Sequence, residues 1–190
     1  MEHEHEVKHL SELDRRKFLQ LSGMATGLAF INSIVSLNSA GALPAAKLPG
    51  FTAFASTVKV FKSDKYYLVE SNGIPAHQMM VGIKSWQQQV PTVQNYTGTN
   101  AWSIPIKPVI ATNPISAKDH FLRGAIAIAV NGVPIFNALN NRGDDALLAG
   151  ELDDWGGHCG RADDYHYHIA PTHLQSVVGK KVPIAFALDG

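Results

Sequence analysis

Three histidines in one short segment form the densest group of residues able to do chemistry in this chain of 190 residues. His166 and His168 are two positions apart, so on an extended strand both imidazoles point to the same face. His158 lies upstream among glycines, which allow the chain to fold back and bring a third nitrogen to that face. Three histidines around an open position are the ligand set of many catalytic zinc and copper centres. The pattern therefore predicts a copper or zinc site.

His77 is a fourth candidate ligand. It follows a turn at residues 71–75, where a metal bond and a structural hydrogen bond are both open to an imidazole. Acidic residues flank the other histidines, and we take Asp163 and Asp164 as the candidate catalytic residues. A carboxylate in such a place can orient a ligating imidazole or act as a general base. The alternative for these aspartates is a solvated acidic loop.

Three functions are compatible with these residues. In a metal-dependent enzyme, the ion would polarise a substrate oxygen or activate water, and one aspartate would move the proton. In a non-catalytic exported binding module, the cluster would be a structural site with four protein ligands or a ligand-contact loop. In a metal-free protein, neighbouring aspartates would satisfy the imidazoles. Nearby tyrosines suit redox-active copper and nearby carboxylates suit hydrolytic zinc, so the sequence leaves the metal open.

The overall composition excludes some classes of partner. Sixteen basic residues balance sixteen acidic ones, so the chain lacks the positive charge that nucleic-acid binding requires. Cys159 is the single cysteine, which rules out an intramolecular disulfide. It adjoins His158, but neighbouring residues point to opposite sides of an extended chain, so we expect it not to bind the metal. A hydrophobic content of 45% is sufficient for one well-packed core.

The N-terminal region is typical of an export signal. Residues 14–20 resemble a twin-arginine motif, the apolar run 21–37 follows it, and small residues at 40–42 provide a cleavage site. We therefore expect a signal peptide over residues 1–42 and a linker over 43–57. The expected partner is the twin-arginine export machinery, and the expected location is periplasmic or extracellular.

Extended patterns dominate the rest of the chain. Residues 65–70 and 124–130 carry the aromatic, branched and alternating residues of strands. Residues 102–106 are strand-like but contain a proline, which predicts an edge strand or an irregular segment. Residues 182–188 predict a final buried strand, whereas helix signals are limited to about two turns within 140–153. The expected fold class is mainly β, sandwich-like or irregular, with few short helices.

Several motifs together resemble the YHYH domain family of exported bacterial proteins. They are, in order, residues 71–77, residues 130–134, Gly157–His158, the Tyr-His-Tyr-His of residues 165–168, and residues 187–190. The resemblance covers residues 58–190, which we expect to form a YHYH domain. Members of the family continue with Phe-Pro-Ile-Tyr after the Asp-Gly turn, so the resemblance implies a domain that is truncated at its C-terminus.

Overall fold

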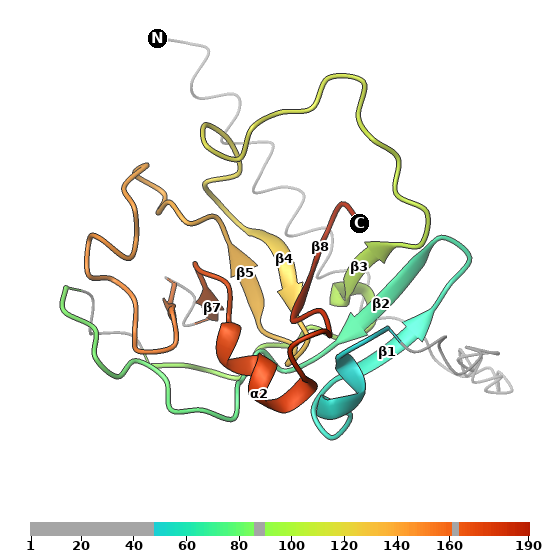
Figure 1. Ribbon diagram of the computed structural model, residues 1–190, viewed down its shortest axis with the longest axis horizontal. Helices are drawn as coiled ribbons and strands as arrows, with labels where there is room; N and C mark the ends of the chain where they lie inside the picture. The colour runs from blue at the N-terminus through green and yellow to red at the C-terminus, as the bar shows by residue number, and fades with distance from the viewer. Residues whose placement is uncertain (1–47, 86–89, 161–163) are drawn as a thin grey trace, which may run out of the picture. The chain divides into compact units, whose positions relative to one another are not determined.

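The computed structural model describes residues 48–85, 90–160 and 164–190, which form two β-sheets with short helices around them (Figure 1). These residues belong to one compact unit. The predicted signal peptide and the first residues of the predicted linker lie outside the described residues. Within the described ranges, no helix has the length and apolar character needed to cross a membrane.

The smaller sheet contains three antiparallel strands. Its order is β1 (Lys59–Lys62), β2 (Tyr66–Glu70) and β3 (Trp102–Pro105), with β2 in the centre. The central position of β2 agrees with its aromatic and branched residues, because side chains of these types pack well on a pleated surface. Strand β3 lies at an edge and ends at its proline. The sequence prediction of an edge strand at this position is confirmed.

The larger sheet has five strands in the order β6-β7-β5-β4-β8. Strands β5 and β7 pair in parallel, and all other neighbours are antiparallel. The turn at Asn131–Gly132 joins β4 to β5, as expected for an Asn-Gly pair between two strands. The strand bounds are Ala125–Ala129 for β4, Pro134–Phe136 for β5, Gly157–Cys159 for β6, Tyr165–Tyr167 for β7 and Ala185–Ala187 for β8.

Helices are few and short, and the prediction of a mainly β fold is confirmed. The described helices are the 3-10 helices η1 (Phe51–Phe54), η2 (Gly98–Asn100) and η3 (Thr172–Leu174) and the α-helix α2 (Gln175–Val178). The helix signal within residues 140–153 corresponds to a turn at 146–150, closed by hydrogen bonds from Ala149 N to Asp145 O and from Gly150 N to Leu147 O. Glycines with positive φ at 143 and 150 bracket this turn and prevent its extension.

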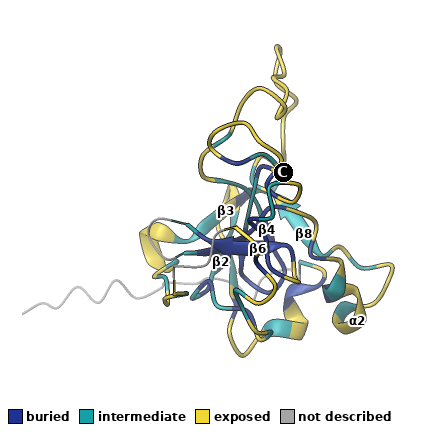
Figure 2. Cartoon of the chain, turned by 90° about the vertical axis from the view of Figure 1, so that its left-hand side faces the viewer, coloured by how far each residue is buried: buried dark blue, intermediate teal, exposed yellow. Residues whose placement is uncertain are grey.

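The prediction of a buried final strand was wrong in one respect. Strand β8 is an edge strand whose residues are half-buried or exposed. It has one neighbour, β4, and its apolar side chains cover the core from one side; Phe186, for example, stacks on Phe51 with ring centroids 5.5 Å apart. Strands β6 and β7 are buried along their whole length, as is the end of β4, and β6 appears in dark blue at the centre of Figure 2.

The turn between β4 and β5 also joins the two sheets. The hydroxyl of Ser71, which follows β2, donates a buried hydrogen bond of 2.6 Å to the carbonyl of Gly132. Gly132 has a φ of +81°, and a Cβ at this position would lie 2.5 Å from the Ser71 Cβ and 2.8 Å from the Val58 Cγ2. Only glycine fits both the backbone conformation and the close approach.

Gly132→Ala is therefore expected to destabilise the fold by at least about 3 kcal/mol, because strain at positive φ and a clash with fixed neighbours add. Gly143→Ala is the matched control. Its φ is +87°, but no heavy atom lies within 4 Å of the Cβ position, so we expect a loss of only about 1 kcal/mol. Urea denaturation of both variants checks the difference, and equal losses would rule out a close approach between the sheets.

Candidate metal centre

Two paired strands place His158 and His166 side by side. In the antiparallel pair β6–β7, His158 lies directly opposite His166, and such cross-strand partners point to the same face of the sheet. His168 comes two residues after His166, immediately beyond β7, and its backbone N–H donates to the carbonyl of Gly156 at 2.9 Å. The extended geometry expected for this segment thus directs all three imidazoles to one side.

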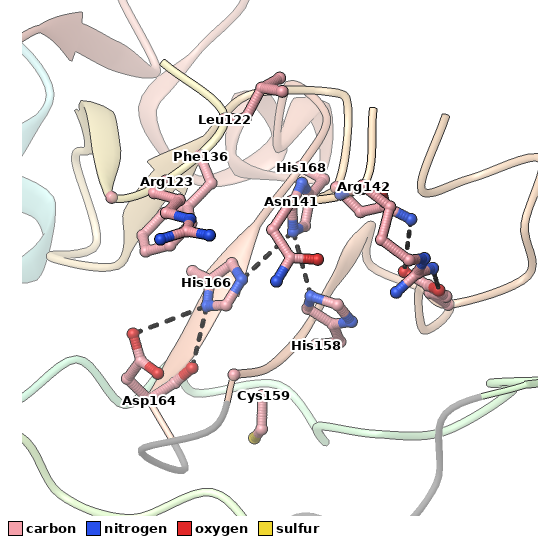
Figure 3. Close-up of a pocket in the computed structure, with 14 residues that line it drawn as sticks. Leu122, Arg123, Phe136, Asn141, Arg142, His158, Cys159, Asp164, His166 and His168 are labelled. Atoms are coloured by element: carbon pink, nitrogen blue, oxygen red, sulfur yellow. Dashed lines mark hydrogen bonds and ion pairs between the residues drawn. The ribbon is translucent and has the colours of Figure 1, made fainter. Parts of the chain in front are cut away.

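The three side chains converge on a small volume (Figure 3). The Nε2 atom of His168 lies 3.0 Å from Nε2 of His158 and 3.2 Å from Nε2 of His166. One nitrogen from each ring lies within 4.8 Å of the others, and all three residues are buried. Metal–nitrogen bonds of about 2.1 Å in a tetrahedral site require nitrogens about 3.4 Å apart. The residues present therefore fit a zinc- or copper-sized ion.

The hydrogen bonds of Nδ1, the ring nitrogen that points away from the cluster, establish the tautomers of His166 and His168. Nδ1 of His166 contacts the backbone carbonyl of Asp164 at 2.9 Å, and Nδ1 of His168 contacts the carbonyl of Asn137. A carbonyl only accepts hydrogen bonds, so both Nδ1 atoms donate. Each Nε2 consequently carries a lone pair directed toward the cluster, which is the arrangement that outer partners impose on metal-binding histidines. Within the described part of the chain, Nδ1 of His158 has no partner at hydrogen-bond geometry, although the Glu151 backbone lies nearby.

Burial keeps the three imidazoles neutral. Loss of solvation, reinforced by the neighbouring His168, lowers the pKa of His158 to about 4. Loss of solvation and the two neighbouring imidazoles lower the pKa of His166 to about 3. Burial also lowers the pKa of His168. All three rings are thus unprotonated at neutral pH, the state in which imidazole binds a metal.

The metal-free protein is expected to lose stability as the pH falls below the ordinary histidine pKa of 6.5. His158 takes up a proton at that pH when unfolded but only near pH 4 when folded. The unfolded state therefore binds more protons in this window, which costs about 1.4 kcal/mol per pH unit. Above pH 6.5 both states are neutral and the effect is absent. Urea denaturation in the presence of a chelator, at about pH 7.5 and about pH 5, should show a weaker pH dependence for His158→Gln. The same dependence in both proteins would contradict the assignment.

A pocket of about 450 Å³ opens beside the histidines. Phe136, the last residue of β5, forms one wall and stacks on His166 with ring centroids 3.9 Å apart. Buried Glu151 lies on another wall, where it pairs with the Arg142 guanidinium and accepts a hydrogen bond of 3.3 Å from Asn140. Sequence reasoning did not find these wall residues. The sole hint was the charged segment 140–151, which has no regular spacing.

The structure does not bring His77 to the cluster. Its Nε2 lies 2.7 Å from the Tyr167 hydroxyl, and its ring stacks on Trp155 with centroids 4.8 Å apart. Tyr167 alternates with His166 along β7, so His77 lies on the face opposite to the three imidazoles. Of the two roles that the sequence left open for His77, this arrangement favours the structural hydrogen bond over the metal bond.

The aspartates of the segment have different environments. Asp164 lines the pocket, and its carboxylate lies 3.8 Å from Nδ1 of His166. Asp163, the other candidate catalytic residue, lies outside the described residues. Asp153 is buried and holds the turn before β6, where it accepts hydrogen bonds from the backbone of Trp155 and Gly157. Of the two described aspartates among these three, Asp164 is therefore the one that lies beside the histidine cluster.

Cys159 and the two tyrosines of β7 belong to the core. Cys159 is fully buried and pairs across the strands with Tyr165, as expected for a residue that points away from its neighbour His158. The Tyr165 hydroxyl donates to Asp153 at 2.8 Å, and the Tyr167 hydroxyl accepts from the Asn131 amide at 3.0 Å. Burial raises the pKa of both tyrosines, so both hydroxyls stay protonated. The strand thus has a histidine face and a tyrosine face.

Comparisons with known proteins point to one family. Neither the search of curated proteins nor the search of solved structures gives a match. Residues 101–190 match the family model described as YHYH protein, and the matched region includes β3 to β8 and all three clustered histidines. Residues 58–100, which we also expect to be part of the domain, lie outside the match. The match thus supports the assignment of residues 101–190 to the YHYH protein family.

Proposed function

We propose that this protein binds one zinc or copper ion through the Nε2 atoms of His158, His166 and His168. The observation that carries the proposal is the convergence of three buried nitrogens at 3.0 and 3.2 Å, two of them with lone pairs fixed toward the cluster. Two lone pairs facing each other across such a distance repel, and a cation between them removes the repulsion. Because burial disfavours protonation of these rings, a metal ion is the cation that fits.

The pocket supports a catalytic role over a closed structural site. Within the described residues, three side chains of metal-binding type form the cluster, whereas a closed structural zinc site has four. The side of the cluster that faces the pocket is available to a small molecule. When bound, the metal supplies Lewis-acid or redox chemistry at that point. Asp164 lies where its carboxylate can orient His166 or hold a proton.

The second candidate is a non-catalytic exported binding module, in which the same cluster is structural. The network around Asn140, Arg142 and Glu151 favours it, because it fixes one pocket wall rigidly. Export itself remains a prediction from residues 1–42, which lie outside the described part of the chain. In both candidates the protein would act in the periplasm or outside the cell.

Elemental analysis and titration calorimetry test the metal site. The wild-type protein, prepared without metal and titrated with Zn²⁺ and separately with Cu²⁺, should bind one equivalent. The double variant His166→Ala with His168→Ala should bind no equivalent at this site. His120→Ala is the matched control, because His120 is exposed and lies outside the cluster. A wild-type protein without stoichiometric metal, or a double variant with unchanged affinity, would refute the assignment.

A further inference from the structure

The pocket beside the histidines has two arginines with different environments (Figure 3). The positive charge of Arg142 is balanced by acidic side chains, because its guanidinium pairs with Glu151 and lies 3.2 Å from the Asp144 carboxylate. Arg123 is exposed and makes no hydrogen bond or ion pair with any described residue. Among the described residues, no acidic side chain therefore pairs with the positive charge of Arg123.

Arg123 is placed to contact a molecule that reaches the three histidines. It lies just before β4 and lines the same pocket as His166, and Figure 3 shows it on the His166 side of the pocket. Phe136 lies on that side too, stacked on the His166 ring. A ligand at this place meets a guanidinium, an apolar ring and the open side of the histidine cluster.

The chemistry of these groups defines a class of ligand. A guanidinium binds carboxylate and phosphate groups through two parallel hydrogen bonds, and it retains its charge at any physiological pH. Phe136 and Leu122 offer apolar surface in the same pocket. A volume of about 450 Å³ suits a small molecule. Asp164, the carboxylate near His166, disfavours a second anionic group at its own end and so helps to orient the ligand.

We propose that the pocket binds a small organic anion, with its carboxylate or phosphate group on Arg123 and its apolar part against Phe136. This inference rests on the proposed function, because the anion would be the substrate of the proposed metal site. Arg123 is then a binding residue that selects anionic substrates. The charge on the ligand is held away from Asp164, and the neighbouring part of the ligand is turned toward the histidines.

Calorimetric titrations with three aromatic probes test the proposal. Phenylacetate and phenyl phosphate should bind to the zinc-loaded wild-type protein, and the uncharged phenylacetamide should bind much more weakly. The tighter of the two anions identifies the anionic group that the pocket prefers. Arg123→Ala should weaken anion binding about 10- to 100-fold, the loss expected for charge-assisted hydrogen bonds. Arg123→Lys should recover part of the affinity, because it restores the charge without the planar fork.

Lys62→Ala is the matched control for the loss of one exposed cation, because Lys62 lies on β1 and does not line the pocket. It should bind the anions like the wild type. Zinc affinity of Arg123→Ala, measured separately, should equal that of the wild type. Equal anion affinity in wild type and Arg123→Ala, or equal binding of phenylacetamide and the two anions, would overturn the anion site. Failure of the wild-type protein to bind zinc would overturn the metal site instead, and the zinc titration alone reports it.

Discussion

Replacing His168 with alanine is expected to raise the dissociation constant for Zn²⁺ by more than about 100-fold, since mutation of the outer partners of metal ligands already costs about 10- to 100-fold. His168 is the central member of the cluster, with its Nε2 at 3.0 Å from His158 and 3.2 Å from His166. Its Nδ1 is also held by the Asn137 carbonyl. Its loss removes one ligand and the atom that both other nitrogens face. Competition of the metal-free protein against a chromophoric chelator measures the change.

His77→Ala is the control for this prediction. His77 contacts the Tyr167 hydroxyl on the opposite face of β7, so its removal should leave zinc affinity unchanged while lowering stability. Circular dichroism at the temperature of the titration verifies that both variants are folded. If His77→Ala weakens zinc binding as strongly as His168→Ala does, His77 is a ligand and the three-histidine assignment is wrong.

Asp153→Ala is expected to lower the free energy of unfolding by about 3–5 kcal/mol, which is an exceptional loss for one substitution. One carboxylate oxygen accepts hydrogen bonds from the backbone N–H groups of Trp155 and Gly157, and the other from Met80 N–H and the Tyr165 hydroxyl. Alanine leaves four donors without their acceptor, and the Tyr165 hydroxyl and the Gly157 N–H are buried. Urea denaturation followed by far-ultraviolet circular dichroism provides the measurement.

The adjacent residue provides the control. Asp154 is exposed, and its side chain makes no hydrogen bond with the described residues. Asp154→Ala removes the same charge from the same turn and should change stability by less than about 0.5 kcal/mol. Comparable losses for the two variants would mean that net charge in the turn, rather than the hydrogen bonds of Asp153, is the stabilising factor.

Local patterns were sufficient to predict several of the strands and the main histidine cluster. Alternation along a strand is independent of the rest of the fold, so the spacing of His166 and His168 predicted a shared face that the structure shows. The composition of residues 65–70 and 124–130 likewise predicted β2 and β4. The glycines around His158 indicated a chain reversal, although the residue lies within strand β6 rather than in a loop.

Features that depend on distant packing could not be predicted. His77 and Tyr167 are 90 residues apart, and no periodicity links a turn to the face of a remote strand. The Asn137 carbonyl that holds His168 is a backbone group, which every residue type carries, so it leaves no mark in the sequence. The pairing of Arg142 with Glu151 depends on an irregular segment. These contacts follow from the tertiary fold rather than from local preference.

Because strand β7 has a histidine face and a tyrosine face, its register against β6 determines which side chains line the pocket. A slip of one residue against β6 would send both tyrosines into the pocket and both histidines into the core, because side chains alternate along the strand. The buried hydrogen bonds of Tyr165 and Tyr167 oppose that slip on the side remote from the pocket. An ion that binds the correctly paired strands stabilises only that pairing. If the proposed ion binds, the Tyr-His-Tyr-His segment would therefore hold it only when the core has assembled in the correct register.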